Sequence, residues 1–238
     1  MAVMTYREAL NEALREEIQR DPDVFLMGEE VAEYDGAYKV SKGLLEEFGD
    51  KRVVDSPISE LGFTGLCVGA SMAGLRPVVE FMTFNFAFLA IDQVINNATK
   101  MYYMSDGQFP MPIVFRGPTG AALQLSAQHS QACETYYSHA PCCKVVTPAT
   151  PADAKGLLQA SIRDNDPVAF MSGELLSHAT VEVPDDDDYV IPLGVADLKN
   201  AGSDVSIIPP GKIASVALPA HRESVVSGNR LDSCSPRF

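Results

Sequence analysis

The chain opens with apolar residues at helical spacing. After Thr5, apolar side chains recur three and four positions apart as far as Ile18. Glu8 stands three residues beyond Thr5, which is the spacing of a capping box, where each side chain accepts a hydrogen bond from the other residue's backbone N–H. The pattern therefore predicts a first helix that begins after Thr5 and ends near Asp21 and Pro22.

The next 150 or so residues alternate between two kinds of apolar pattern. Short runs, too brief for helices, lie at residues 24–27, 53–54, 77–81, 112–115, 144–146 and 168–171. They predict strands buried on both faces of a sheet. Longer patterns of helix length lie between them, at residues 62–74, 87–103, 131–138 and 151–163. This alternation predicts an α/β fold with a doubly wound, mostly parallel sheet, in which functional sites lie at the carboxyl ends of the strands.

The pattern weakens after Met171, and four consecutive aspartates at residues 185–188 form an acidic run. A charge run of this kind is typical of a solvated linker. A further strand is expected at residues 205–208, with little chain after it. We therefore predict a first domain over residues 1–184, an acidic linker over 185–203, and the start of an incomplete C-terminal domain over 204–238.

Composition narrows the class of protein. The 238 residues are 46% hydrophobic, enough for a full core, and the net charge is −14. Nucleic acids and anionic membranes are recognised by clustered Lys and Arg, so we expect neither as a partner. No apolar run approaches the roughly 18 residues of a membrane helix. The N-terminus lacks the features of a signal or transit peptide, so a cytoplasmic location is expected. The five cysteines lack zinc-site spacing and are expected to be reduced thiols.

Glu60 points most directly to chemistry. It follows the strand predicted at residues 53–54 and begins a helix rich in Gly, Ala and Ser. A carboxylate in this position has few routes to solvent, so either the helix dipole stabilises it or it acts on a ligand. The residue alone leaves both interpretations open.

Five motifs, in the same order, resemble one known family. They lie at residues 55–63, 74–77, 80–86, 91–96 and 128–131. The family is that of the β subunits of 2-oxoacid dehydrogenase first components, which are thiamine-diphosphate-dependent and transketolase-like. The resemblance is nearly continuous from residue 5 to residue 205. It implies that the first domain binds the aminopyrimidine ring of thiamine diphosphate, while a separate α subunit holds Mg²⁺ and the diphosphate.

The resemblance also implies roles for four residues. Glu60 hydrogen-bonds the pyrimidine ring nitrogen and shares a proton with the ring. Phe86 stacks against the ring, and Met82 lies in the same pocket. His129 faces the active site and assists transfer of the acyl group to a lipoyl carrier.

A second set of residues matches the family's monovalent-cation site, where several ligands are backbone carbonyls. The set comprises Ile113, Ser161, Ile162, Asp164 and Asp166. Hard oxygen donors, including the carbonyls freed at the end of a helix, suit such an ion. The resemblance therefore implies a site for potassium.

The activity implied is that of the pyruvate dehydrogenase branch of the family. We expect thiamine-diphosphate-dependent oxidative decarboxylation of pyruvate and acetylation of lipoyl-lysine on a dihydrolipoyl acyltransferase core, only together with the α subunit in an α₂β₂ heterotetramer. Residues 32–38 and 115–118 favour pyruvate over the alternatives, a branched-chain 2-oxoacid or acetoin. A non-catalytic fragment or interaction module is an alternative of another class, because the sequence after residue 218 departs from the family pattern.

Overall fold

Six parallel strands form the main sheet of this protein. The structure is a computed structural model in which residues 2–121, 124–226 and 231–235 are described. The sheet order is β3-β2-β4-β5-β7-β6. The strands are β2 (Val24–Gly28), β3 (Val53–Asp55), β4 (Arg76–Glu80), β5 (Val114–Thr119), β6 (Lys144–Val146) and β7 (Val168–Gly173). Every neighbouring pair runs parallel, so the predicted parallel α/β sheet is confirmed.

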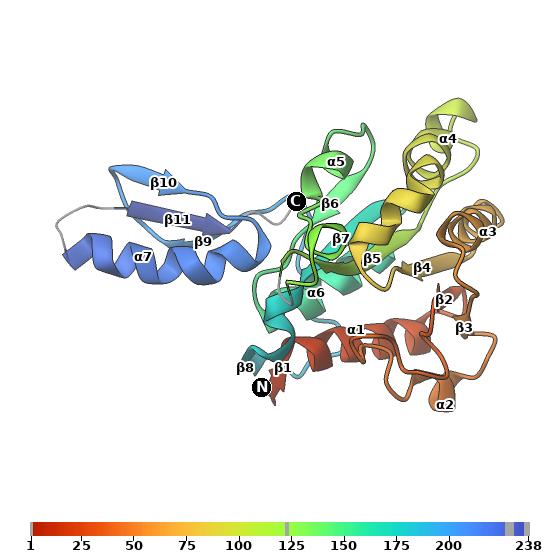
Figure 1. Cartoon of the computed structure of the whole chain (residues 1–238), viewed down its shortest axis with the longest axis horizontal. Coiled ribbons are helices and arrows are strands. Elements are labelled where there is room, and N and C mark those ends of the chain that lie inside the picture. Colours follow the sequence, from red (N-terminus) through yellow and green to blue (C-terminus); the bar gives the residue numbers. More distant parts are fainter. Residues whose placement is uncertain (1, 122–123, 227–230, 236–238) are drawn as a thin grey trace.

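Helices cover both faces of this sheet and bury an apolar core on each (Figure 1). On one face, α1 (Tyr6–Arg20) packs against α6 (Pro151–Arg163). On the other lie α3 (Glu60–Met72), η1 (Phe84–Ala90) and η2 (Gln93–Ala98). Val78 and Val79 of β4 belong to different cores, because successive side chains of a strand point to opposite faces. The strands are apolar on both sides for this reason.

The first helix begins and ends where the sequence predicted. The Glu8 backbone N–H donates to Thr5 Oγ1 over 3.2 Å, and the Thr5 N–H donates to Glu8 Oε2 over 2.7 Å. This capping box satisfies two backbone donors that the helix leaves free at its start. α1 ends at Arg20, and Asp21 already has extended backbone angles.

The segment expected as one helix over residues 87–103 is divided into three. η1 is a 3₁₀-helix, η2 is a π-helix, and α4 (Thr99–Met104) is a short α-helix. The prediction of a single helix was wrong because the buried residues Phe84, Ala87 and Ala90 are three apart, and a 3₁₀-helix places such residues on one face.

The helix expected over residues 131–138 is shorter than predicted. It forms as α5 (Glu134–Ser138). Gln131 lies outside it because its backbone N–H and C=O are bonded to Asn85 and Gly120 instead.

A short strand, β8 (Thr180–Val183), pairs antiparallel with β1 (Ala2–Thr5) and brings the chain back beside α1. Residues 184–196 then carry neither helix nor strand, yet Ile191 is buried in the core that α1 and α6 share. The acidic run lies in this irregular segment, where Asp188 pairs with Arg163.

The last part of the described chain forms a second, small sheet, seen to the left of the main sheet in Figure 1. Its order is β10-β11-β9. The elements are β9 (Asp197–Asn200), β10 (Val205–Ile207), η5 (Gly211–Ile213), α7 (Ala214–Val226) and β11 (Leu231–Ser235). β9 lies inside the range expected as linker because it pairs with β11. The boundaries of the two domains stay a prediction.

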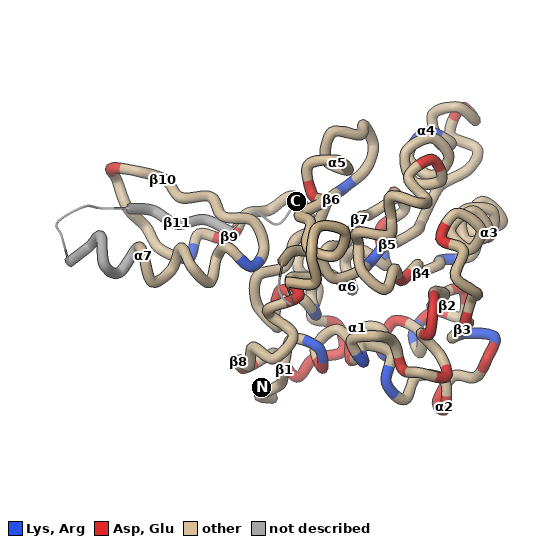
Figure 2. Tube along the Cα trace, viewed as in Figure 1, with Lys and Arg blue, Asp and Glu red and all other residues tan. Residues whose placement is uncertain are grey.

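Charged positions are unevenly spread over the main sheet. Figure 2 shows them gathered around α1, β3 and α2 (Leu44–Phe48), while the helices on the other face carry few. Within the described residues, no helix is both long and apolar enough to cross a lipid bilayer.

Candidate functional site

Carboxylates follow three neighbouring strands at the carboxyl edge of the main sheet. Asp55 ends β3, Glu29 directly follows β2, and Glu80 ends β4. The sheet order reverses at β2, because β3 pairs with one side of it and β4 with the other. Ligands of open α/β sheets bind at such a switch point. The topology thus brings acidic side chains to the place where the sequence predicted a site.

The backbone is closely packed and well fixed at this edge. A Cβ atom on Gly28 would lie 2.3 Å from the Glu80 carbonyl oxygen, so only glycine fits where β2 passes β4. The Asp55 carboxylate accepts hydrogen bonds from the backbone N–H groups of Ala32 (2.7 Å) and Glu33 (3.0 Å). The loop that leaves β2 therefore starts along a fixed path.

Glu60 is the first residue of α3 and is only 6% exposed. Among the residues that the structure describes, none donates a hydrogen bond to its carboxylate. Burial raises the pKa of the nearby Glu29 carboxyl above its ordinary value, and the charges of Glu60 and Glu30 raise it further. The site therefore offers one largely buried acceptor without a donor among the described residues, beside a second carboxyl whose pKa is raised. Sequence reasoning missed Glu29, although its position directly after an apolar strand was a usable signal.

The structure brings Phe86 and His129 into contact. Phe86 lies in η1 after β4, and His129 lies in η3 (Ala127–His129) after β5. Their ring centroids are 5.2 Å apart and their planes meet at 88°, which is an edge-to-face arrangement. Both side chains are half-buried, as is Met82 in the turn before η1. An aromatic face and an imidazole can thus reach the same ligand.

Asn85 ties together the segments that carry these two rings. Its buried side chain donates to Thr83 Oγ1 over 2.9 Å and accepts from the Gln131 backbone N–H over 3.1 Å. The Gln131 carbonyl accepts in turn from the Gly120 N–H and the Thr119 hydroxyl, over 3.0 and 3.2 Å. Sequence reasoning gave Asn85 no role, although its place beside Phe86 directly after a strand was a signal.

Apolar side chains are exposed around Glu60. Ile58, Leu61 and Leu66 are exposed by 78%, 51% and 59%. α3 also packs against η1, so this apolar surface adjoins the segment that carries Phe86. Several large apolar side chains in the open beside a buried carboxylate are typical of a surface that another chain covers.

A buried ion pair lies behind the carboxyl edge. Arg116 of β5 donates to Glu80 of β4, and both side chains are almost completely buried. Beside it, the Tyr38 hydroxyl donates to Glu174 Oε1 over 2.5 Å, which joins the loop after β2 to η4 (Glu174–His178). The ion pair joins β4 to β5, and the Tyr38 hydrogen bond holds the loop against η4. Sequence reasoning missed the pair because no local spacing relates residues 80 and 116.

Basic side chains contact most of the residues expected at the cation site. Arg76 donates to the Ile162 carbonyl over 3.0 and 3.1 Å and to the Asp164 carbonyl over 2.8 Å. Lys144 Nζ lies 2.7 Å from a carboxylate oxygen of Asp164 and 3.0 Å from one of Asp166. These oxygen atoms are brought together, with two protein cations as their partners.

The other two residues of that set have internal partners. The Ile113 carbonyl accepts from the Val168 N–H, and the Ser161 hydroxyl donates to the Leu157 carbonyl over 2.7 Å. No group of three or more His, Cys, Asp and Glu side chains in the described part of the chain could hold a metal ion.

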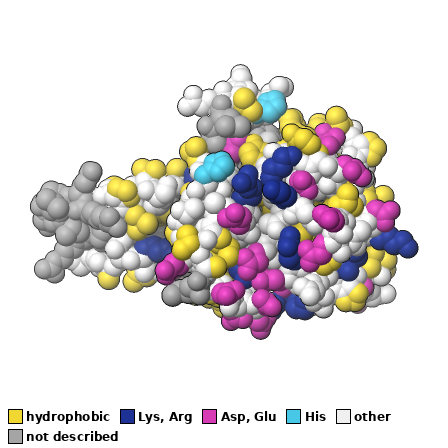
Figure 3. All heavy atoms as spheres, turned by 90° about the horizontal axis from the view of Figure 1, so that it is seen from below, with side chains coloured by type: hydrophobic (Ala, Val, Ile, Leu, Met, Phe, Trp, Pro, Cys, Tyr) yellow, Lys and Arg dark blue, Asp and Glu magenta, His cyan; other side chains and the backbone are white. Residues whose placement is uncertain are grey.

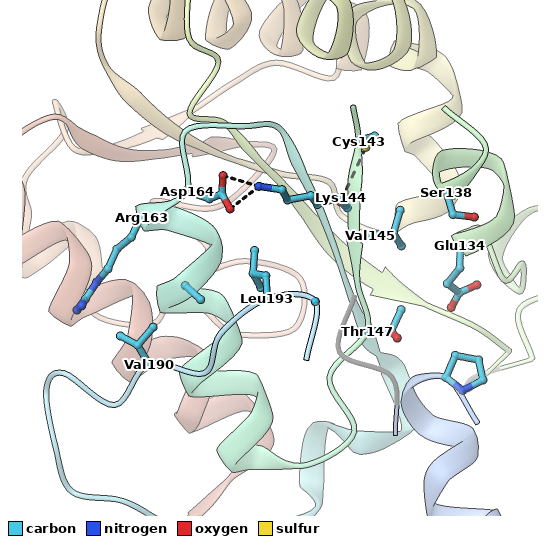
Figure 4. Close-up of a pocket in the computed structure, with 13 residues that line it drawn as sticks. Glu134, Ser138, Cys143, Lys144, Val145, Thr147, Arg163, Asp164, Val190 and Leu193 are labelled. Atoms are coloured by element: carbon cyan, nitrogen blue, oxygen red, sulfur yellow. Dashed lines mark hydrogen bonds and ion pairs between the residues drawn. The ribbon is translucent and has the colours of Figure 1, made fainter. Parts of the chain in front are cut away.

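A cavity of about 780 Å³ lies beside β6, at the edge of the sheet (Figure 4). Its walls come from α5, β6, α6 and the irregular segment around Leu193. Figure 4 shows the Lys144–Asp164 pair on one side of it and Glu134 on the other. Glu60, Phe86 and His129 do not line this cavity, so it is separate from the carboxyl-edge site.

Several known proteins are similar to this chain in sequence or in fold. A family model described as the transketolase pyrimidine-binding domain matches residues 2–178. The chain is 57% identical over 228 residues to the pyruvate dehydrogenase E1 component subunit beta of Rhizobium meliloti (strain 1021), covering 96% of this chain and 50% of that protein. It is 55% identical over 225 residues to the mitochondrial subunit of that name from Caenorhabditis elegans, covering 93% of this chain and 64% of that protein.

A solved structure described as a split gene transketolase, an inactive beta4 tetramer, superimposes with a TM-score of 0.77. The match covers 98% of this chain and 71% of that one, at 20% identity, and therefore concerns the fold. The resemblance drawn from the sequence motifs is confirmed by the relatives. The chain spans between half and two thirds of the length of these two relatives.

Proposed function

Since this chain belongs to the transketolase pyrimidine-binding domain family, we propose that it supplies half of a thiamine diphosphate site and serves as the β subunit of a pyruvate dehydrogenase first component. The observation that carries the proposal is Glu60, a buried carboxylate at a helix start for which no described residue is a hydrogen-bond donor. A ring nitrogen of the cofactor provides the partner that the protein does not.

The residues at the carboxyl edge fit a pyrimidine ring. Glu60 offers an acceptor on a largely buried side chain, and Phe86 offers a half-buried aromatic face on the neighbouring element. Met82 adds a flexible apolar side chain on the segment that carries Phe86. Thiamine diphosphate, when bound, supplies the carbon that attacks the 2-oxoacid carbonyl and accepts the electrons of decarboxylation.

The chain's own residues then bind, orient and move protons. Glu60 holds a proton shared with the ring nitrogen, and Phe86 orients the ring by stacking. His129 donates a proton or hydrogen bond to the substrate, since an imidazole can do so near neutral pH. Asn85 keeps His129 and Phe86 in one arrangement through Gln131.

A second chain is needed to complete the site. The exposed apolar residues beside Glu60, among them Ile58 and Leu61, suit an interface with an α subunit, which we propose to hold Mg²⁺ and the diphosphate in an α₂β₂ assembly. Pyruvate is the proposed substrate because the two relatives described above are named pyruvate dehydrogenase. The acetyl group passes to lipoyl-lysine of an acyltransferase core.

Two further expectations stay predictions. We propose a potassium site at the five-residue set described above. A potassium ion there has to compete with Arg76 and Lys144, which already contact several oxygen atoms of that set. A cytoplasmic location is inferred from the sequence, whereas the name of one relative includes the word mitochondrial.

Co-expression with a pyruvate dehydrogenase α subunit tests the proposal. Pyruvate decarboxylation by the purified complex should fall about 100-fold or more in Glu60→Gln, because general acid–base contributions are of this size. Glu134→Gln is the matched control, since Glu134 is also the first residue of a helix and carries the same charge. It should leave the rate nearly unchanged.

Three outcomes would count against the proposal. Turnover by the purified chain without an α subunit would contradict the shared site. Silence of both native and Glu60→Gln complexes, with the α subunit folded and bound, would favour a non-catalytic interaction module. Faster turnover of 3-methyl-2-oxobutanoate or acetoin than of pyruvate would replace the substrate assignment.

A further inference from the structure

A cavity of about 600 Å³ lies between the N-terminal half of α1 and the end of the loop that joins β2 to α2. Four basic residues line it, Arg7 and Arg15 from α1 and Lys39 and Lys42 from the loop. The mechanism proposed above uses none of them. Because the chain as a whole carries a net charge of −14, such a concentration of positive charge is a local exception.

Each of the two acidic residues that line this cavity accepts a hydrogen bond from a backbone N–H. Glu8 Oε2 accepts hydrogen bonds from the N–H and the hydroxyl of Thr5, over 2.7 and 2.8 Å. Asp35 Oδ1 accepts from the Gly43 N–H over 3.0 Å. Their carboxylates thus serve the helix cap and the loop.

The basic side chains are less completely paired. Arg15 lies 3.3 Å from Glu47 at the surface, and Lys39 Nζ donates to the Tyr34 carbonyl over 2.5 Å. In the described part of the chain, Arg7 and Lys42 form neither an ion pair nor a side-chain hydrogen bond. These two cations therefore have no ion-pair partner among the described residues, although the charge of Arg7 also acts on the neighbouring Glu8 carboxylate.

The walls of the cavity are already fixed in the free chain. Asn11 of α1 donates to the carbonyls of Val40 and Lys42, over 2.6 and 3.1 Å, and so fastens the loop to the helix. Lys39 has a left-handed backbone, with φ of 60°, and its ammonium lies 3.2 Å from the centre of the Tyr34 ring. A binding site whose groups are fixed in advance loses less entropy when it binds.

We propose that this cavity binds a small oxyanion with two or more negative charges, of the phosphate or polycarboxylate class, between Arg7 and Lys42. Oxygen atoms of such an ion accept charge-assisted hydrogen bonds from both side chains, which are among the stronger polar contacts in proteins. Figures 2 and 3 show basic and acidic positions interspersed around α1 and the neighbouring loops, and four basic side chains meet at the lining of the cavity.

The loop that joins β2 to α2 connects this cavity to the carboxyl edge of the sheet. The same loop starts at Glu29 and passes Gly36, where an added Cβ atom would lie 3.3 Å from Glu80 Oε1. An anion that joins α1 to Lys42 adds a second restraint at the far end of the loop, beside the hydrogen bonds of Asn11. The binding reaction itself requires neither an α subunit nor catalysis.

Titration calorimetry on the full chain tests this proposal. Inorganic phosphate and citrate are the probes, each compared with sodium chloride at equal ionic strength. The test variant is Arg7→Gln with Lys42→Gln. The matched control, Lys51→Gln with Lys100→Gln, removes the same charge from residues that do not line the cavity. We expect saturable binding that the test variant weakens about tenfold or more and the control leaves nearly unchanged.

Amide hydrogen exchange provides a second readout on the native chain. Binding of either probe should slow exchange over residues 35–43 more than over the rest of the protein. If the double variant does not fold, Lys42→Glu, a reversal of charge at an exposed side chain, takes its place. Tighter binding of phosphate assigns a phosphate compound, and tighter binding of citrate assigns a polycarboxylate. Absence of saturable binding for both probes, or equal weakening in test and control variants, would overturn the proposal.

Discussion

Removing one partner of the Glu80–Arg116 pair should destabilise this chain more than removing both. The pair joins the neighbouring strands β4 and β5, and the two side chains are 6% and 1% exposed. Arg116→Met leaves the Glu80 carboxylate buried without its counter-charge. Glu80→Met leaves the Arg116 guanidinium buried without its counter-charge. Breaking a buried pair in this way lowers the free energy of unfolding by about 3 to 5 kcal/mol.

The double variant should recover most of that loss. Arg116 Nε is buried without a hydrogen-bond partner, so the pair is incompletely satisfied even in the native protein. Replacing a buried ion pair by well-packed hydrophobic side chains of similar volume is often neutral. We therefore expect the double variant to lie within about 2 kcal/mol of the native free energy of unfolding, well short of the roughly 6 to 10 kcal/mol of additive losses.

Urea unfolding at neutral pH, followed by circular dichroism, measures these differences. Arg15→Met is the matched control, because Arg15 also loses an ion pair, but one in which the two side chains are 37% and 41% exposed. Such a surface pair contributes less than about 1 kcal/mol. A loss below about 1 kcal/mol for Arg116→Met, or losses that simply add in the double variant, would refute the reasoning.

Two further predictions concern the carboxyl edge. Asn85→Ala should lower the free energy of unfolding by about 1 to 3 kcal/mol, because the Gln131 N–H loses its acceptor. The same change should shift the NMR signals of His129. Asn85→Asp is the control, since it keeps the acceptor and most of the stability. Glu29→Gln should stabilise the chain relative to the native protein increasingly as the pH rises. The folded-state pKa of Glu29 is raised above 4.5, so its ionised form opposes folding above that pH, and the difference in melting temperature should be larger at about pH 7 than at about pH 4.

A different result would contradict each of these two predictions. Unchanged His129 signals in Asn85→Ala would show that the Gln131 contact does not position the imidazole. A melting-temperature difference for Glu29→Gln that is constant, or that shrinks as the pH rises, would show that burial and the charges of Glu60 and Glu30 do not raise the pKa of Glu29 in the folded chain.

Local patterns in the sequence were enough for the regular elements that neighbouring residues specify. The capping box of Thr5 and Glu8 gave the start of α1, and Thr150, whose hydroxyl accepts from the Asp153 N–H, begins α6 at the predicted residue. Prediction was wrong for the helix expected at residues 87–103, where burial at every third residue outweighed helix propensity. The position of Glu60 between a strand and a helix also followed from the sequence, and Glu60 is the first residue of α3.

The sequence by itself determined the alternation of strands and helices, the family and the identity of Glu60, because each depends on residues close together in the chain. Only the tertiary structure decided that Phe86 meets His129, that Asn85 bonds Gln131, that Glu80 pairs with Arg116 and that Arg7 shares a cavity with Lys42. These contacts join segments that lie far apart in the chain and that strand pairing and helix packing bring together. The local spacing of residues does not predict which segments meet.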